Sequence, residues 1–310
     1  MICTVTLNTS IDKAYRMAAP VRVGEVQRVS EVIDRAGGKG LNAARAVKTC
    51  GEEVLATGFV GGHNGALLCE LLDADGVPHD FCEIVGETRC CINALDPTGE
   101  STEFLEPGCP VTAADLDAVV GRVAELAAKA DVVTINGSAP AGAPVTVYAR
   151  LIEAIKATGA PVLLDTSGDL LVEGVKARPT MVKPNTDEIA AVLGHPVGGR
   201  DEVLAAAREL HDRGVEKVVV SLGGAGSVMV SDAGTFVGQA PAIDVVNPVG
   251  SGDTLVGAFA VAMARAVGDP KALAYAMACA SANCLSAETG AFDPAVADEL
   301  LGQAVVERVG

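Results

Sequence analysis

Short apolar runs alternate with segments of helical spacing along most of this chain, and this alternation restricts the possible folds more than any other feature. The apolar runs predict strands at 2–7, 53–60, 131–137, 161–167, 180–185 and 216–223. The segments of helical spacing lie at 40–50, 64–74, 112–130, 144–158, 201–213, 252–267 and 270–287. Several strands carry polar residues only at their C-terminal ends, as buried parallel strands do. The sequence therefore predicts an α/β fold, with a mostly parallel sheet covered by helices on both faces.

Two stretches, 13–35 and 88–107, break this alternation. Both are extended in pattern, with alternating polarity and turns, and helical spacing is weak in them. We expect antiparallel strands outside the main sheet that form a small lid over a site, with ordinary edge hairpins as the alternative. The 310 residues contain no internal repeat and no long linker, so we expect one domain, 1–310, in which these lid segments are inserted.

The formal net charge of −17 argues against a general role in binding nucleic acid or anionic membranes. No stretch reaches the ~18 uncharged apolar residues of a membrane span, and the start of the chain lacks the basic region and long apolar core of a signal peptide. The nine cysteines include no C-x-x-C pair and only four histidines are present, so neither a zinc site nor a disulfide framework is expected. These features predict a cytoplasmic protein with reduced cysteines.

A glycine turn near the C-terminus, NPVGSGDT at residues 247–254, opens a predicted helix. Its two glycines allow a tight turn that directs several backbone N–H groups one way, and the helix dipole adds positive charge there. Such a turn can hold an anion, and Asp253 beside it can act as a base in phosphoryl transfer to a hydroxyl. A dinucleotide fingerprint is excluded because Leu255 takes the third glycine position. An ordinary acid at the start of a helix remains the alternative for Asp253.

Polar and basic residues in the first half suggest contacts to a polyol or its phosphate. Asp12 follows the first strand, where a short acid can accept hydrogen bonds from sugar hydroxyls or simply cap a helix. The segment AGGKGLN, residues 36–42, opens a helix beside Lys39 and can hold an anion or sugar hydroxyls, although a plain turn has the same composition. Arg89 and Arg28 lie in the lid segments and are either oxyanion clamps or surface ion-pair partners.

Two motifs in the second half suggest contacts to a nucleotide. In KPNTDE, residues 183–188, Asn185 and Glu188 share one helical face and can hold a hydrated Mg²⁺, although N-x-x-E is also a capping box. The turn SLGGAG, residues 221–226, offers backbone N–H groups to phosphates, as a tight hairpin also would. All these motifs lie at predicted C-terminal strand ends, where open α/β sheets bind their ligands.

On these motifs the chain resembles the pfkB (ribokinase-like) family of carbohydrate kinases, from TVTLNTSID near its start to NPVGSGDT and the terminal helices. The resemblance implies a ribokinase-like three-layer α/β sandwich with a mostly parallel central sheet and a small β-strand lid. It implies an anion hole formed by Gly250, Ser251 and Gly252, with Asp253 as the base. It also implies ATP and Mg²⁺ as cofactors, with the metal held through water by Asn185 and Glu188.

The same resemblance divides the other candidates between two ligands. On the sugar-phosphate side it places Asp12, Arg28, Gly37, Gly38, Lys39, Asn42, Arg89 and Ser138. On the ATP side it places Lys183, Asn185, Ser221, Gly223, Gly226 and Asn283. By analogy with related kinases, we also expect a homodimer formed through the lid.

The expected substrate already carries one phosphate, because Lys39 in AGGKG and Arg89 in ETR are similar to the hexose-phosphate branch of the family. The segment ETRCCI favours D-tagatose 6-phosphate, converted to D-tagatose 1,6-bisphosphate, whereas Cys91 and Asn93 depart from the fructose 1-phosphate pattern. Phosphorylation of fructose 1-phosphate or fructose 6-phosphate is the alternative. A kinase of an unphosphorylated sugar would not need Lys39 and Arg89, and a non-catalytic sugar-phosphate sensor would not need the base, anion hole and metal motif together.

Overall fold

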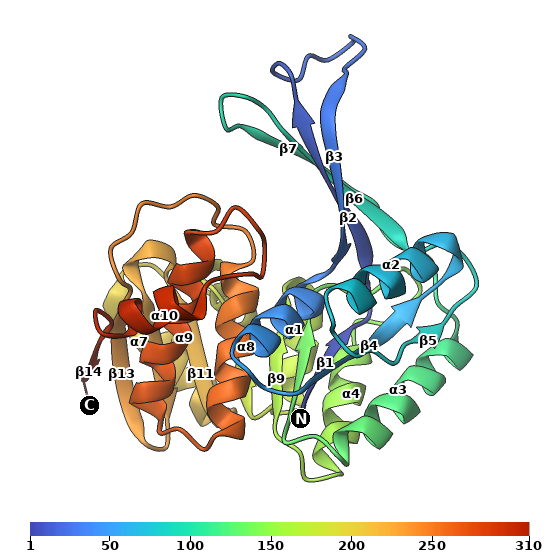
Figure 1. Ribbon diagram of the computed structural model, residues 1–310. Coiled ribbons are helices and arrows are strands. Elements are labelled where there is room, and N and C mark those ends of the chain that lie inside the picture. The colour runs from blue at the N-terminus through green and yellow to red at the C-terminus, as the bar shows by residue number, and fades with distance from the viewer. Residues whose placement is uncertain (310) are drawn as a thin grey trace.

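The computed structural model describes residues 1–309, and a large sheet with helices on both faces forms its body (Figure 1). In that range the sheet has ten strands in the order β14-β13-β12-β11-β10-β9-β8-β1-β4-β5. They are β1 Ile2–Thr6, β4 Val54–Val60, β5 Cys82–Glu83, β8 Val132–Asn136, β9 Val162–Asp165, β10 Met181–Val182, β11 Lys217–Ser221, β12 Ser227–Ser231, β13 Gly234–Gln239 and β14 Val305–Arg308. Parallel pairing joins seven neighbouring strands, β5, β4, β1, β8, β9, β10 and β11. Antiparallel pairing then adds β12, β13 and β14 at one edge. The predicted, mostly parallel sheet is confirmed.

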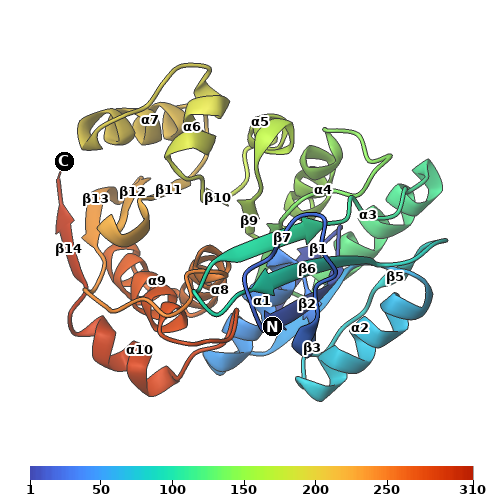
Figure 2. The ribbon, with the colours of Figure 1, turned by 90° about the horizontal axis from the view of Figure 1, so that it is seen from above.

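The helices cover both faces of this sheet, which makes the body a three-layer sandwich (Figure 2). They are α1 Lys39–Thr49, α2 Gly62–Ala74, α3 Ala113–Ala127, α4 Val147–Lys156, α5 Gly168–Lys176, α6 Thr186–Leu193, α7 Arg200–Asp212, α8 Ser251–Ala264, α9 Asp269–Cys284 and α10 Pro294–Leu301. Helices α3 to α7 bury one apolar cluster against the sheet, and α1, α2, α8, α9 and α10 bury the other. Alternation along β1 feeds both clusters, because Cys3 and Val5 point to one face and Ile2 to the other. Among the helices of residues 1–309, none is both long enough and apolar enough to cross a bilayer.

Several elements of the structure lie outside the predicted ones. The alternation does not predict α5 and α10, which have nine and eight residues and are too short for a clear helical period. It also does not predict the hairpin of β12 and β13 or the last strand, β14, whose pairing is antiparallel. The three strands enlarge the sheet at the edge remote from β1 and leave the predicted parallel part unchanged.

The lid is a separate four-stranded sheet in the order β3-β2-β6-β7, and it rises from the body on the side of the carboxyl ends of the parallel strands (Figure 1). Its strands are β2 Ser10–Met17, β3 Val29–Gly37, β6 Arg89–Leu95 and β7 Ser101–Leu105. The expectation of antiparallel strands is corrected in one respect, because the central pair, β2 and β6, is parallel. Each lid segment folds as its own antiparallel hairpin. The two hairpins meet through their first strands, β2 and β6, which run in the same direction.

Candidate active site

The start of α8 is open to an anion. Gly250 has a φ of 78°, and a Cβ there would lie 2.6 Å from Cγ2 of Thr289, so this position requires glycine. In the described chain no side chain caps α8. The backbone N–H of Thr254 donates to the carbonyl of Gly250 at 2.8 Å, and that of Ser251 donates to the carbonyl of Pro248 at 3.3 Å. The N–H groups of Gly252 and Asp253 have no partner among the described residues and remain open to a ligand. The helix dipole therefore presents unshielded positive charge at Gly250, Ser251 and Gly252.

A second uncapped helix begins beside the first. Gly38 precedes α1 with a φ of 115°, and a Cβ there would lie 2.8 Å from Cγ2 of Thr6 on β1. No side chain in residues 1–309 caps α1 either. The two helices touch along their backbones, because a Cβ at Gly257 would lie 2.7 Å from the carbonyl oxygen of Ala43. Two helix N-termini thus face one region at the carboxyl end of the sheet.

Asp253 lies in the first turn of α8 and is only 7% exposed. The side-chain amide of Asn42, on α1, donates to its Oδ2 at 2.8 Å. Burial and then the nearby Asp165 raise the pKa of Asp253 to about 6, against the hydrogen bond from Asn42 and the charges of Lys39 and Lys183. A carboxylate with this pKa accepts a proton more readily than an exposed aspartate, as a general base near neutral pH must.

Two lysines supply positive charge around Asp253. Lys183 is buried, and its Nζ lies 3.0 Å from Oδ1 of Asp165 at the end of β9. The same ammonium lies against the start of α8, because a Cβ at Gly252 would be 3.6 Å from it. Asp165, followed by Asp253 and Glu188, raises the pKa of Lys39, so this lysine lies in the field of the same carboxylates. Asp165 was not among the candidates from the sequence. Its position at the polar C-terminal end of the predicted strand 161–167 was the feature that could have indicated it.

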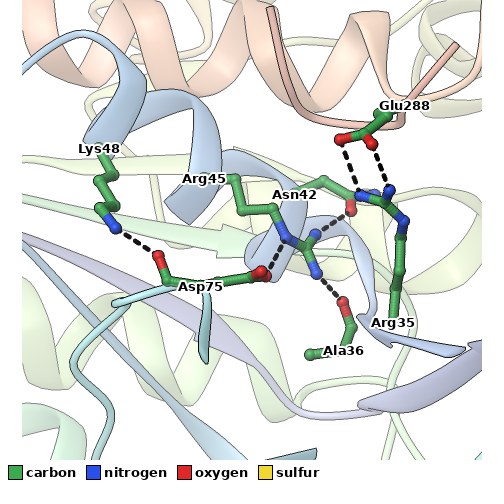
Figure 3. A network of polar contacts seen from close by, with 7 residues as sticks. All are labelled: Arg35, Ala36, Asn42, Arg45, Lys48, Asp75 and Glu288. Carbon is green, nitrogen blue, oxygen red and sulfur yellow. Dashed lines mark hydrogen bonds and ion pairs between the residues drawn. The ribbon is translucent and has the colours of Figure 1, made fainter. Parts of the chain in front are cut away.

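The base of the lid forms the other wall of the site. Asp12 on β2 accepts a hydrogen bond from Ser10 Oγ at 2.6 Å, and burial raises its pKa. A Cβ at Gly37 would fall 2.1 Å from the carboxyl carbon of Asp12, so the glycine makes room for this side chain. Near the end of β3, the strand that carries Gly37, Arg35 pairs with Glu288, with 2.7 Å between Nη2 and Oε1. This pair joins the lid to the loop after α9 (Figure 3).

Arg89 lies at the first residue of β6, beside this wall. Its Nη1 donates to the carbonyl of Glu106 at 2.9 Å and its Nη2 to the carbonyl of Asn8 at 3.1 Å. Its Nε is buried and has no hydrogen-bond partner in the described residues. Ser138 is exposed nearby, and its Oγ accepts from Asn8 Nδ2 at 3.0 Å. The positive charge of Arg89 close to an exposed hydroxyl is suited to an anionic substituent of a ligand.

The nucleotide-side candidates meet where β10 and β11 end. Asn185 and Ser221 form a parallel bridge, and the backbone N–H of Ser221 donates to Pro184 at 3.0 Å. The turn that follows contains Gly223 and Gly226, which both have positive φ. This turn therefore lies next to the KPN segment, as the sequence suggests.

The capping-box interpretation of N-x-x-E is confirmed. Asn185 Oδ1 accepts from the N–H of Glu188 at 2.8 Å, and Glu188 Oε2 accepts from the N–H of Asn185 at 2.9 Å. This engages one oxygen of each side chain and leaves Glu188 Oε1 free of the box. In residues 1–309 no group of three or more His, Cys, Asp or Glu side chains forms a metal cage.

Two predicted residues occupy other positions. Arg28 is exposed at the lid tip, immediately before β3. Gly37 ends this strand, and the length of β3 alone separates the two residues by roughly 25 Å at the usual rise of a strand. The structure therefore does not bring Arg28 to this site. Asn283 is fully buried, and its amide is used internally: Nδ2 donates to the carbonyl of Val249 at 3.0 Å and Oδ1 accepts from the N–H of Gly290 at 2.8 Å. Asn283 joins the loops behind Gly250 and does not face a ligand.

Comparison with known proteins agrees with this geometry. The family model of the pfkB family carbohydrate kinases matches residues 5–295, so the chain belongs to the pfkB family of carbohydrate kinases. As a member of this class it is an ATP-dependent sugar kinase.

Solved structures of similar proteins cover the chain almost completely. Phosphofructokinase-2 of Escherichia coli, in complex with potassium, is 26% identical over 97% of this chain and 98% of its own, with a TM-score of 0.93. A possible 1-phosphofructokinase of Thermotoga maritima is 25% identical over 100% of both chains, with a TM-score of 0.90. A Staphylococcus aureus protein named as a phosphofructokinase is 28% identical over 100% of this chain and 99% of its own, with a TM-score of 0.87. The ribokinase-like fold expected from the sequence is confirmed.

Proposed function

We propose that this protein phosphorylates a ketohexose monophosphate to the bisphosphate with ATP, and that D-tagatose 6-phosphate, converted to D-tagatose 1,6-bisphosphate, is its preferred substrate. One observation carries the proposal: the buried Asp253 stands at an uncapped helix start with two lysines beside it. Fructose 1-phosphate and fructose 6-phosphate are the alternative acceptors, and the names of the similar structures favour them. We further propose that all 310 residues form one kinase domain with its lid.

Asp253 accepts the proton of the acceptor hydroxyl as that oxygen attacks the terminal phosphorus of ATP, and the bond from this phosphorus to the bridging oxygen breaks, so that ADP leaves. The N–H groups at the start of α8 stabilise the charge on the phosphoryl group during transfer. Lys183, held at 3.0 Å by Asp165, adds a fixed positive charge at the same place. Since the transition state of phosphoryl transfer is loose, orientation by Asp253 contributes as much as its basicity.

The lid side of the site holds the sugar phosphate. Asp12 accepts hydrogen bonds from ring hydroxyls, and the guanidinium charge of Arg89, near Ser138, binds the existing phosphate. With the phosphate fixed at one end, Asp253 must meet the hydroxyl at the other. In the furanose form of a ketohexose 6-phosphate this is the C1 hydroxyl. Fructose 1-phosphate would have to bind in the reverse sense, which changes the partner of each ring hydroxyl.

Glu188 fits a hydrated Mg²⁺, because the capping box leaves its Oε1 free and Mg²⁺ in kinases usually keeps several waters. When bound with ATP, the metal would neutralise phosphate charge. Glu188→Gln tests this role, since glutamine also serves in a capping box and the fold is retained. We expect the Mg²⁺ concentration for half-maximal activity to rise with an unchanged melting temperature. An unchanged Mg²⁺ requirement would remove Glu188 from the metal site.

Steady-state kinetics on D-tagatose 6-phosphate, fructose 6-phosphate and fructose 1-phosphate, with ADP release as the readout, test the proposed function. We expect the highest kcat/KM for D-tagatose 6-phosphate, with fructose 6-phosphate next because it differs only at C4. Asp253→Asn should lower turnover by roughly 10²–10⁴-fold while nucleotide binding persists. Preference for fructose 1-phosphate by tenfold or more would replace the proposed substrate. Absence of turnover on all three would overturn the function itself.

The lid carries exposed apolar side chains that a second copy of this chain would cover. Val32, Phe104 and Leu105 are 48%, 57% and 63% exposed. We propose a homodimer through the lid, in keeping with the expectation from related kinases. Light scattering on the purified protein should give twice the mass of the chain, and Phe104→Lys should shift it toward the monomer. A monomer for the unmodified protein would exclude this arrangement.

We also propose a cytoplasmic location, with which the nine unpaired cysteines are consistent.

A further inference from the structure

Arg45 is a buried arginine on α1, and all three of its side-chain nitrogens donate hydrogen bonds to groups of the protein itself. It is 8% exposed and lies one helical turn after Asn42. Its Nη1 donates to Asn42 Oδ1 at 2.9 Å, and Asn42 Nδ2 donates to Asp253 Oδ2 at 2.8 Å. Arg45, Asn42 and Asp253 therefore form a chain of hydrogen bonds that ends at the proposed base (Figure 3 shows its first link).

The chemistry of the three groups allows only one orientation of the Asn42 amide. A guanidinium group can only donate hydrogen bonds, and a carboxylate can only accept them. Since Asn42 lies between the two, its oxygen must face Arg45 and its nitrogen must face Asp253. Without the arginine the amide of Asn42 is free to rotate. If its oxygen then faced Asp253, two partly or fully negative oxygens would repel each other and the hydrogen bond to the carboxylate would be lost.

Arg45 is itself held at all three nitrogens. Nε donates to Asp75 Oδ2 at 2.9 Å, and Nη2 donates to the carbonyl of Ala36 at the base of the lid. Asp75 is the C-cap residue that follows α2, and its carbonyl accepts a hydrogen bond from Lys48 on α1 (Figure 3). The planar guanidinium is therefore fixed by α2, the lid base and α1 together, which gives Asn42 a rigid partner.

We infer that Arg45 is a positioning residue for the proposed reaction: it fixes the amide of Asn42, and through it the orientation and basicity of Asp253. This inference rests on the proposed function. The other groups that face Asp253 are Asp165 on β9, Lys39 on α1 and Lys183 after β10, and Arg45 touches none of them. Arg45 therefore acts on Asp253 through Asn42, and the amide of Asn42 serves mainly to bind these two residues and not the sugar.

Arg45 also acts on a second carboxylate, by charge alone. Its positive charge lowers the pKa of Asp12, together with the Ser10 hydrogen bond and Arg89, whereas burial and Glu103 raise it. A lysine at position 45 keeps this charge but has no planar fork to hold the Asn42 oxygen. Comparison of Arg45→Met with Arg45→Lys therefore separates the effect of charge on Asp12 from the effect of orientation on Asp253.

The test is a double-mutant cycle of Arg45→Met and Asn42→Ala, with kcat and its pH profile as readouts. A hydrogen bond to a charged group is worth roughly ten- to a hundredfold in rate, so each single variant should lose that much. Because the two residues act in series, Arg45→Met should cost little more in the Asn42→Ala background. The acid limb of kcat should move to higher pH in Arg45→Met and only partly return in Arg45→Lys. Losses that multiply would overturn the inference.

A direct titration keeps the inference testable whatever the substrate is. NMR of protein labelled at its aspartate carboxyl carbons follows Asp253, whose resonance is identified by its loss in Asp253→Asn. We expect Asp253 to titrate at higher pH in Arg45→Met than in the unmodified protein, and an unchanged titration would overturn the inference. Arg122→Met is the matched control, because Arg122 on α3 is also paired with an aspartate, Asp80, but does not touch the site. Failure of all sugar phosphates as substrates, with the titration shifted as expected, would refute the proposed function alone.

Discussion

At the scale of single residues, the pKa of Asp253 governs how activity depends on pH. A base works only when unprotonated, so activity is present above its pKa and is lost as the pH falls through it. We therefore expect kcat/KM for the sugar phosphate to fall on the acid side with an apparent pKa of about 6, the value that burial and Asp165 impose on the free protein. A kcat/KM profile that stays flat down to about pH 4, near the ordinary pKa of aspartate, would contradict this assignment.

The same shift makes Asp253 costly for stability. Its folded-state pKa is raised above the ordinary value of 3.8, so its contribution to folding is most favourable below that value and is lost as the pH rises through about 6. Asp253→Asn lacks this dependence, and its stability relative to the unmodified protein should increase by about 2 kcal/mol between pH 4 and pH 7. Urea unfolding at several pH values measures the difference. A difference that is constant with pH would show that the carboxylate is not perturbed in the folded protein.

The two basic residues assigned to the substrate phosphate should differ in kinetic effect. Arg89 lies on the lid side, whereas Lys39 lies in the field of Asp165, Asp253 and Glu188. We expect Arg89→Met to raise KM for the sugar phosphate by roughly tenfold or more with little change in KM for ATP. Lys39→Met should mainly lower kcat, because its charge is nearer the transferring group. If Arg89→Met raises KM for ATP instead, that residue has been placed on the wrong ligand.

At the scale of elements, the contact of β2 with β3 at the lid base sets the position of Asp12. Gly37 has an ordinary φ, so alanine fits its backbone, but the new Cβ would overlap the Asp12 carboxyl group at 2.1 Å. Gly37→Ala should therefore raise KM for the sugar phosphate by about tenfold or more and leave KM for ATP unchanged. Gly121→Ala in α3 is the control, since nothing lies within 4 Å of its Cβ and the helix should become about 1 kcal/mol more stable. Equal KM values for Gly37→Ala and the unmodified protein would mean that Asp12 does not contact the sugar.

Elements with strong local signals could be predicted, and those that depend on pairing could not. Helix α1, expected at 40–50, forms at Lys39–Thr49, and α8, expected at 252–267, forms at Ser251–Ala264, because glycine turns and apolar spacing mark them locally. The parallel pairing of β2 with β6 has no such signal. It joins segments about 80 residues apart, and only the packed structure decides which strand becomes the neighbour.

At the scale of the whole molecule, the same distinction limits what the sequence says of the site. The motif residues are recognisable one by one, but the contact of Asn42 with Asp253 spans 211 positions. Asp165 becomes important only because Lys183 is buried against it, and Asn283 is excluded as a ligand only because Val249 and Gly290 occupy its amide. Residue type and spacing predict the chemistry available to the chain, whereas partner choice follows from packing.

The nine cysteines offer a prediction for the whole chain. All are unpaired in the structure, two of them fully buried. Thiol titration of the denatured protein should find nine thiols both with and without prior reduction, since free cysteine here serves as a small apolar residue. A reproducible shortfall without reductant would show that a disulfide forms.

The uncapped starts of α1 and α8 have a practical consequence for anyone who handles this protein. Two helix ends with unused N–H groups, close to two lysines, attract any small tetrahedral anion and not only the phosphates of a substrate. Sulfate or phosphate buffers should therefore raise the melting temperature of the empty protein and compete with both ligands in rate measurements. Assays in an organic zwitterionic buffer with chloride as the counterion should report the higher activity, and crystals grown from ammonium sulfate should carry the anion where the phosphoryl group passes.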